Sequence, residues 1–347
     1  MGPLVEDRHA LVGFSCLEIA RQEQLERLEL EITDESPSGA LAFLDVVRKG
    51  TGQVKELEMR VHHAEVVETR DLTSAMRRIV FGGPGIADYG STGVGDEYIR
   101  LLFPEDPDQR PQLAKVVDGN LDYSSIDLGR LRTYTIRGWD AERGRLTVDF
   151  VVHEGGVAAA WALQARPGQV IGVNTPTGMY EPPADVRWQV LVADYAGLPA
   201  AVRIVEDTPD LRTRLVLEVP EPGLEVEVPD RENLEIVWIH GGNGHAPSQL
   251  EEVVRSLPRP DGEGYVWVAG ESKVLRGVRK YFRHELKLPA SAYKTVGYWI
   301  EDAEKWRERW DALDAGTRAA LDAIWERDAD EDELVDEYDA RLTELGL

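Results

Sequence analysis

Residues 130–161 constrain the fold most, because a strand pattern rich in Arg, Tyr and Thr is followed one hairpin later by paired glycines. The strand spans residues 132–137 and reads RTYTIR, so alternation places Arg132 and Tyr134 on one face with Ile136. A guanidinium and a phenol ring on one face suit a ligand that combines a diphosphate with a flat heterocycle. The pattern therefore predicts a groove for such a ligand along this strand.

The segment that follows predicts a phosphate site. The opposite face of the strand carries Thr133, Thr135 and Arg137, and Thr135 can offer its N–H or hydroxyl to a ring nitrogen. After a hairpin turn and a second strand, paired glycines open an alanine-rich run, 157–165, which predicts a short helix. A helix N-terminus entered through glycines presents backbone N–H groups and a positive dipole end. A phosphate is therefore expected where this helix begins.

The order of the motifs in this part of the chain resembles that of a known flavoprotein family. The motifs are R-x-Y-T-x-R at 132–137, D-F-V-x-H at 149–153, G-x-A-x-x-W at 156–161 and P-G-x-x-(I/L)-G at 167–172. Together they are similar to the FAD domain of the siderophore-interacting proteins, flavin ferric-siderophore reductases related to the ferredoxin reductase superfamily. Segments 71–81 and 96–104 resemble the first barrel strands of that family, and segments 192–200, 267–271 and 297–299 resemble its nucleotide-domain landmarks.

The resemblance implies a role for particular residues in binding FAD. Tyr134 would pack against the isoalloxazine, Arg132 would neutralise the diphosphate and Thr135 would contact the redox edge of the ring. His153 would lie near the FAD, and the backbone N–H groups after Gly156 would bind the diphosphate. The complete implied cofactor set is Arg132, Tyr134, Thr135, His153, Gly156, Ala158, Ala159, Trp161, Tyr298 and Trp299.

The sequence departs from the family pattern at the start of the predicted helix. The family often has Pro-Ala-Ser-Arg-Trp where residues 157–161 read Val-Ala-Ala-Ala-Trp, so a serine hydroxyl and an arginine are missing. Backbone donation survives this change, and we expect weaker phosphate binding. The pair Tyr298-Trp299 stands where the family has an aromatic pair, although core packing is the alternative for both residues.

The pattern of strands and helices divides the chain into four parts. Residues 1–60 are an N-terminal extension outside the resemblance, with a predicted helix over 17–30. Residues 61–183 carry strands separated by Gly- and Pro-rich turns, which predicts a closed antiparallel FAD-binding β-barrel. Residues 184–300 alternate strands with helices, which predicts a three-layer α/β domain like those that bind NAD(P)H. The fold class is therefore β + α/β with helical terminal extensions.

The last part, residues 301–347, is an acidic helical tail. It contains 17 acidic and 6 basic residues. An apolar stripe predicts that at least its first helix packs onto the body of the protein. The residues of this stripe are Trp306, Trp310, Leu313, Leu321, Ile324 and Trp325.

Composition limits the partners and the redox chemistry. The net charge of −25 arises from 64 acidic against 39 basic residues, which disfavours nucleic acid and anionic membranes. The single cysteine, Cys16, excludes an intrachain disulfide and a cysteine-based iron–sulfur cluster within one chain. The chain shows neither a secretory signal pattern nor eighteen uninterrupted apolar residues, so a cytoplasmic protein is expected.

The electron donor and the substrate site are less well defined by the sequence. NAD(P)H is the expected donor, although no G-x-G-x-x-G occurs, and a reduced ferredoxin is the alternative that the acidic surface opposes. Ferric siderophores often carry negative charge, which calls for cations at the cleft. The candidates for substrate binding are Arg77, Arg78, Lys115 and Arg137, each of which can also be an ordinary surface charge.

The resulting hypothesis is an FAD-dependent ferric-siderophore reductase. Two alternatives stay open, a general NAD(P)H-flavin oxidoreductase with another acceptor, and a non-catalytic siderophore-binding protein whose flavin site has decayed. The sequence leaves open the siderophore, the choice among NADH, NADPH and ferredoxin, the oligomeric state and the role of residues 1–60.

Overall fold

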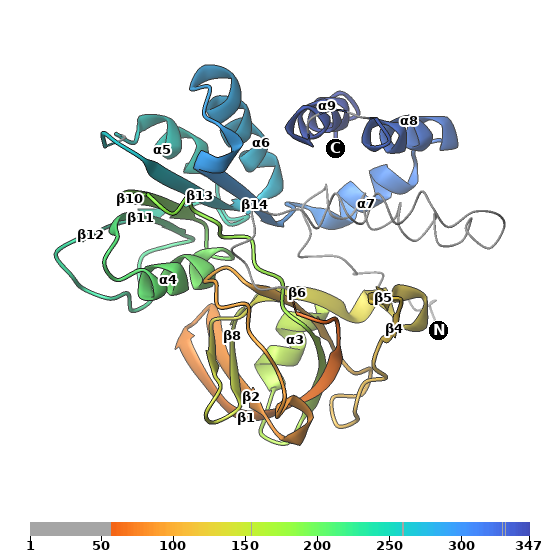
Figure 1. The fold of residues 1–347 in the computed structure, drawn as a ribbon. Coiled ribbons are helices and arrows are strands. Elements are labelled where there is room, and N and C mark those ends of the chain that lie inside the picture. The colour runs from red at the N-terminus through yellow and green to blue at the C-terminus, as the bar shows by residue number, and fades with distance from the viewer. Residues whose placement is uncertain (1–56, 154, 259, 328, 330) are drawn as a thin grey trace.

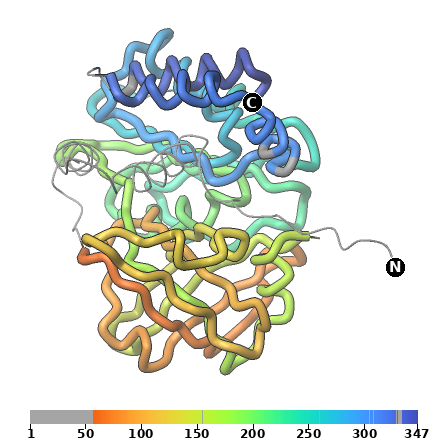
Figure 2. Tube along the Cα trace, turned by 90° about the vertical axis from the view of Figure 1, so that its right-hand side faces the viewer, coloured from red at the N-terminus to blue at the C-terminus, as the bar shows by residue number. Residues whose placement is uncertain are grey.

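The structure is a computed structural model that describes residues 57–347 except positions 154, 259, 328 and 330. The helix expected over 17–30, and almost all of the predicted N-terminal extension, lie outside the described residues. Figure 1 shows three parts, an antiparallel sheet, a parallel sheet flanked by helices, and a group of C-terminal helices. Figure 2 shows them stacked in this order. The expected β + α/β fold class is confirmed.

The first part is a seven-stranded antiparallel sheet. Its strand order is β6-β3-β9-β1-β2-β8-β7. The strands are β1 (Val61–Thr73), β2 (Met76–Gly82), β3 (Tyr98–Leu102), β6 (Leu131–Thr135), β7 (Gly138–Asp140), β8 (Arg145–Val151) and β9 (Val170–Asn174). A separate hairpin joins β4 (Lys115–Val117) and β5 (Asn120–Asp122). Short helical turns in this part are η1 (Pro84–Ile86), η2 (Tyr123–Ser125) and η3 (Leu128–Arg130).

The sheet is barrel-like, but the expected closed ladder is wrong. The strands at the two edges, β6 and β7, do not pair with each other within the described residues, because β6 pairs with β3 and β7 pairs with β8. The core inside the curved sheet is aromatic, and α3 (Val157–Gln164) contributes to it. Trp161 of this helix stacks on Phe81 with ring centroids 6.2 Å apart and lies 5.3 Å from the ring of Phe103.

The second part is a five-stranded parallel sheet of order β12-β11-β10-β13-β14. The strands are β10 (Trp188–Ala193), β11 (Arg212–Val219), β12 (Leu234–His240), β13 (Gly264–Glu271) and β14 (Tyr293–Trp299). These strands are nearly continuously apolar, because helices cover both faces of the sheet. One face packs on α4 (Leu198–Asp207), and the other packs on α5 (Leu250–Ser256) and α6 (Ser272–Lys280), which continues into a π-helical turn (Tyr281–Glu285). A further turn, η5 (Ala290–Ala292), precedes β14.

Two adjacent buried carboxylates join the sheets. Asp96 accepts hydrogen bonds from the indole of Trp267 on β13 at 3.0 Å and from the linker N–H of Tyr180 at 2.7 Å. Glu97 receives the guanidinium of Arg203 on α4 at 2.8 Å. Both carboxylates are fully buried, so their partners offset the cost of removing charge from water. This joint holds α4 against the barrel-like sheet.

The C-terminal helices form a small core of their own. They are α7 (Ala303–Asp311), α8 (Ala315–Trp325) and α9 (Glu331–Glu344). The predicted apolar stripe packs mainly within this group and against Ile300, with Trp306 and Trp310 stacked at 5.4 Å. In α9, Asp339 binds Arg279 of α6 at 2.5 Å, so charge pairs add to the attachment. No helix in the described part of the chain is long and apolar enough to cross a membrane.

Candidate active site

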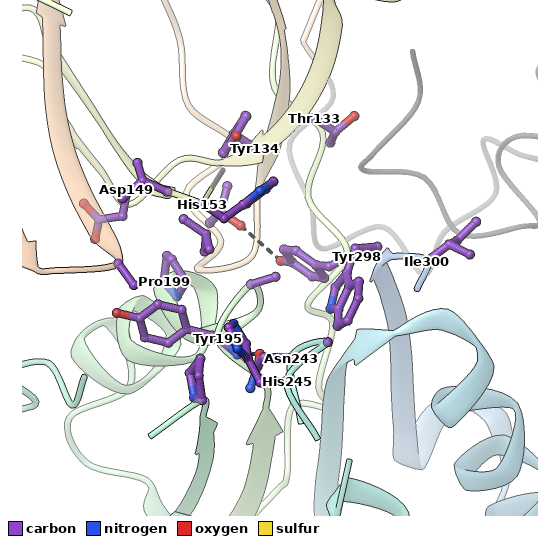
Figure 3. A pocket seen from close by; sticks show the side chains of 18 of the residues that line it. Thr133, Tyr134, Asp149, His153, Tyr195, Pro199, Asn243, His245, Tyr298 and Ile300 are labelled. Carbon is purple, nitrogen blue, oxygen red and sulfur yellow. Dashed lines mark hydrogen bonds between the residues drawn. The ribbon is translucent and has the colours of Figure 1, made fainter. Parts of the chain in front are cut away.

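A cavity of about 470 Å³ lies between the barrel-like sheet and the carboxyl ends of the parallel strands. Figure 3 shows side chains from both parts facing this space. Its volume falls within the range of ligand sites in proteins, about 300–1,000 Å³. The described residues that line it are Ala75, Thr133, Tyr134, Thr135, Asp149, Val151, Val152, His153, Tyr195, Ala196, Pro199, Pro220, Asn243, Gly244, His245, Tyr298, Trp299, Ile300 and Ala303.

Strand β6 provides the barrel side of the cavity. Tyr134 packs against Phe150 of the aromatic core, with ring centroids 4.4 Å apart, while its other surface lines the cavity. Burial raises the pKa of the Tyr134 phenol, so this hydroxyl stays protonated. The next residue, Thr135, points to the other domain, where its Oγ1 lies 3.1 Å from the hydroxyl of Tyr298. Both residues line the cavity, Tyr134 with its ring against the aromatic core and Thr135 with its hydroxyl beside Tyr298.

Loops after the parallel strands provide the opposite wall. Trp299 at the end of β14 donates its indole N–H to Asp194 at 2.6 Å, and the same carboxylate accepts the N–H groups of Ala196 and Gly197. Burial raises the pKa of Asp194 to about 6 despite these donors, and the nearby Glu218 also favours the protonated form. Asp194 thus fixes the orientation of an aromatic side chain in the wall.

A glycine-rich loop after β12 brings His245 to the cavity. Gly241, Gly242, Asn243 and Gly244 all have positive φ, a region that glycine enters freely and asparagine tolerates. The Asn243 side chain holds the loop, because its Oδ1 accepts the N–H of Tyr195 at 2.9 Å. The loop therefore depends on backbone geometry rather than on the spacing of a dinucleotide motif.

A second group of residues, next to the cavity, fits a diphosphate. Gly155 and Gly156 have φ of 86° and 77°, and a Cβ built on Gly155 would meet nothing within 4 Å. A Cβ on Gly156 would lie 3.6 Å from Cε1 of His153, so this turn adjoins the cavity wall. The N-terminus of α3 follows directly and has no side-chain cap among the described residues. Backbone donors and open space meet at this point.

Arg132 also fits an anionic ligand. Its side chain is 3% exposed, and its Nη1 donates to the carbonyls of Gly129 and Leu131 at 2.9 and 2.7 Å. Its Nη2 is buried with no hydrogen-bond partner among the described residues. Burial lowers the pKa of this guanidinium, and the turn that contains Gly129 packs against α3. An unpaired buried donor is costly, so a phosphate oxygen would relieve that cost.

The structure brings most of the predicted cofactor residues together. Tyr134, Thr135, His153, Tyr298 and Trp299 line the cavity, while Arg132, Gly156, Ala158 and Ala159 lie at the adjoining turn and helix. Ala158 and Ala159 are 5% and 3% exposed as whole residues, so each offers a ligand little surface. Trp161 is 3% exposed in the barrel core, where it positions α3.

Of the four cations predicted for substrate binding, Arg78 and Arg137 lie together, with Asp149 at 2.6 and 3.8 Å from their Nε atoms, while Arg77 and Lys115 have other surroundings. Arg78 donates to both oxygens of Asp149, at 2.6 and 2.7 Å, and Arg137 pairs with Glu206 of α4 through two contacts of 2.6 Å. Arg77 binds Asp71 at 2.6 Å. Lys115 lies in the separate β4–β5 hairpin. None of the four is among the described residues that line the cavity.

Sequence reasoning missed Tyr195, Asn243 and His245. The signal was present, because the glycine-rich stretch 241–244 follows a strand whose carboxyl end lies at the ligand edge of an α/β sheet. That stretch lacks the spacing of a dinucleotide motif, so its role depends on the loop geometry that the fold creates.

Comparisons with known proteins identify the family. The siderophore-interacting FAD-binding domain matches residues 65–180, and the siderophore-interacting protein model matches residues 186–302. An uncharacterized protein of Mycobacterium tuberculosis is 31% identical over 279 residues, which cover 74% of this chain and 98% of the relative. The NADPH-dependent ferric-chelate reductase of Escherichia coli is 26% identical over 246 residues, 70% of this chain and 94% of that protein.

A solved structure agrees with these matches. The siderophore utilization protein from T. fusca superimposes with a TM-score of 0.64 at 31% identity, covering 72% of this chain and 96% of its own. The family matches span the barrel-like sheet and the parallel sheet, and residues 303–347 lie beyond both. The chain therefore belongs to the siderophore-interacting protein family, with an FAD-binding domain at residues 65–180.

Proposed function

We propose that this chain is an FAD-dependent ferric-siderophore reductase that uses NADPH. The observation that carries the proposal is the cavity between the sheets, which adjoins a glycine-opened helix N-terminus and the unpaired Nη2 of Arg132. We further propose that residues 61–183 form the flavin unit and residues 184–300 the nicotinamide-nucleotide unit. We assign the reaction to the cytoplasm, where NADPH and FAD are supplied.

The residues at this site have distinct roles in holding FAD. Arg132 and the N–H groups at the start of α3 would bind the diphosphate. Tyr134 and Thr135 would bound the flat ring system, with the Tyr134 phenol kept protonated by burial. FAD would supply the redox chemistry, because a flavin accepts two electrons as a hydride and passes electrons singly to Fe(III). Fe(II) binds hard oxygen donors less tightly, so the iron is released.

The second unit would place the nicotinamide donor beside the same cavity. Tyr298 and Trp299 close the space from the carboxyl edge of the parallel sheet, where α/β domains bind nucleotides. The similarity to the NADPH-dependent ferric-chelate reductase of Escherichia coli supports NADPH over a reduced ferredoxin. Oxidation of one NADPH balances the reduction of two Fe(III) chelates to Fe(II) and releases one proton.

Anaerobic kinetics of the purified protein test this proposal. The protein is expected to carry FAD, to bleach on addition of NADPH and to yield two Fe(II), trapped by ferrozine, per NADPH consumed. NADH and reduced ferredoxin are compared under the same conditions, and protein stripped of FAD is the control. Protein that takes up no FAD would contradict the proposal. Flavin that NADPH reduces without any Fe(II) release from ferric chelates would favour a general oxidoreductase instead.

A further inference from the structure

We propose that the site selects ferric chelates that are neutral or positively charged, such as trihydroxamates, over anionic chelates such as triscatecholates. This inference rests on the proposed function and names its substrate class. Three hydroxamates neutralise Fe(III), whereas three catecholates leave a net charge of −3. The charges around the cavity decide between these classes.

The wall of the cavity offers no fixed positive charge. Within the part of the chain that the structure describes, no lysine or arginine lines it, and the titratable groups there are Asp149, two histidines and three tyrosines. The remaining lining residues are apolar, aromatic or neutral polar. An anionic chelate that entered this space would lose water without gaining a cationic partner, which is unfavourable in a low-dielectric site.

The arginines next to the cavity are already neutralised. Arg78 donates two hydrogen bonds to Asp149, which lines the cavity and is 5% exposed. Arg137 is held by Glu206, and Arg203 by Glu97. A chelate could recruit these guanidinium groups only by breaking short charged contacts, and two of the three ion pairs cross between the domains. Arg132 belongs to the diphosphate site, and bound FAD would add further negative charge to the same cleft.

Carboxylates border the cavity on the side of the C-terminal helices. Ile300 and Ala303 line it, and the two residues between them, Glu301 and Asp302, are exposed acids, of which Asp302 pairs with Lys305 at 2.7 Å. Residues 301–347 together carry a net charge of −11. A protein of net charge −25 attracts cationic ligands and repels anionic ones at low ionic strength.

The aromatic wall complements the charge. Tyr298 and Trp299 offer ring surfaces to the organic body of a chelate, and a pendant ammonium group is attracted by such rings. A chelate with a neutral iron core and a cationic arm therefore matches both the apolar wall and the acidic border.

A matched series of chelates tests the proposal. Ferrioxamine B carries +1, its N-acetyl derivative 0 and its N-succinyl derivative −1, with the same iron coordination in all three. We expect kcat/KM for Fe(II) release to fall in that order at an ionic strength of about 10 mM and to converge toward about 1 M salt. Ferric enterobactin, at −3, is expected to react slowest. Equal rates in the series at low salt, or a preference for the −1 chelate, would overturn the proposal.

Charge reversal at the cavity border gives a second test. For Glu301→Lys at roughly 10 Å from the chelate, Coulomb's law in water predicts that kcat/KM changes roughly fourfold, down for +1 and up for −1. The N-acetyl chelate is expected to be unaffected. The readout is the ratio of +1 to −1 rates within each variant, which does not depend on the folded fraction. An unchanged ratio would contradict the role of the border.

The control is Glu142→Lys. Glu142 is an exposed acid in the turn before β8, whose other end reaches the cavity at Val151. Seven residues of strand separate them by about 23 Å, so the same change of charge should alter the ratio much less. Failure of the proposed function looks different, because no chelate would then yield Fe(II), and that result would also remove the basis for this inference.

Discussion

Replacement of Arg132 by alanine should separate FAD binding from stability. In the protein without ligand, this guanidinium is buried, donates from Nη1 to two carbonyls and leaves Nη2 without a partner among the described residues. Removal of a buried, incompletely paired charge offsets the loss of those two bonds, so we expect the Tm of the apoprotein to change by no more than about 2 °C. Loss of charged hydrogen bonds to the diphosphate is expected to cost about 1.5–3 kcal/mol.

The affinity for FAD measures this effect directly. A loss of 1.5–3 kcal/mol raises the Kd for FAD roughly 10- to 150-fold. Titration of stripped protein with FAD, followed by quenching of flavin fluorescence, gives the Kd, and thermal unfolding gives Tm with and without FAD. At an FAD concentration that saturates the wild type, FAD should raise the Tm of Arg132→Ala much less than it raises the Tm of the wild type.

Arg137→Ala is the matched control. Arg137 lies between β6 and β7 and binds Glu206, so its loss should affect the contact between the domains and leave the Kd for FAD within about threefold. Equal increases in Kd for the two variants would refute the assignment of the diphosphate to Arg132. A fall in the apoprotein Tm of Arg132→Ala as large as the fall with FAD would refute the argument from the unpaired Nη2.

Three further predictions concern the joint and the second wall. Asp194 has a pKa of about 6 in the folded protein, above its unfolded value near 4, so its contribution to stability is complete below pH ~4 and is lost as the pH rises through 6. The free energy of unfolding, measured with urea, should therefore fall less over this pH range in Asp194→Asn than in the wild type, by up to ~3 kcal/mol. Fluorescence reports whether Trp299 moves. Gly95→Ala would place a Cβ 2.7 Å from the backbone of Ile204, so a loss of ~2 kcal/mol and a lower Tm are expected by calorimetry, and an unchanged Tm would contradict this close approach. Tyr298→Phe should lower kcat/KM for ferric chelates with little change in the Kd for FAD, and a parallel change in both would place Tyr298 in the flavin site alone.

Local patterns in the sequence predicted much of the fold. The alternation of strands and helices predicted over residues 184–300 is present as strands β10 to β14 with helices α4, α5 and α6, because buried strands and amphipathic helices have strong local periodicity. The three-residue strands β4, β5 and β7 were not predicted. Such short segments carry too few residues for alternation to appear.

The motif order also predicted the family, which the comparisons confirm. The residues around Tyr134 and Gly156 stand near each other in the chain, on the consecutive elements β6, β7, β8 and α3, so a linear pattern can describe them. The individual binding roles of these residues remain predictions.

The sequence by itself determined which strand and which turn could hold a diphosphate and a flat ring, because that geometry follows from strand alternation and from glycines at a helix start. Only the tertiary structure decided which charges remain available. Arg78 meets Asp149 across 71 residues of chain, Arg137 meets Glu206 across 69, and Asp194 meets Trp299 across 105. Whether a guanidinium can bind substrate depends on such distant partners. The sequence alone does not show which charges are paired.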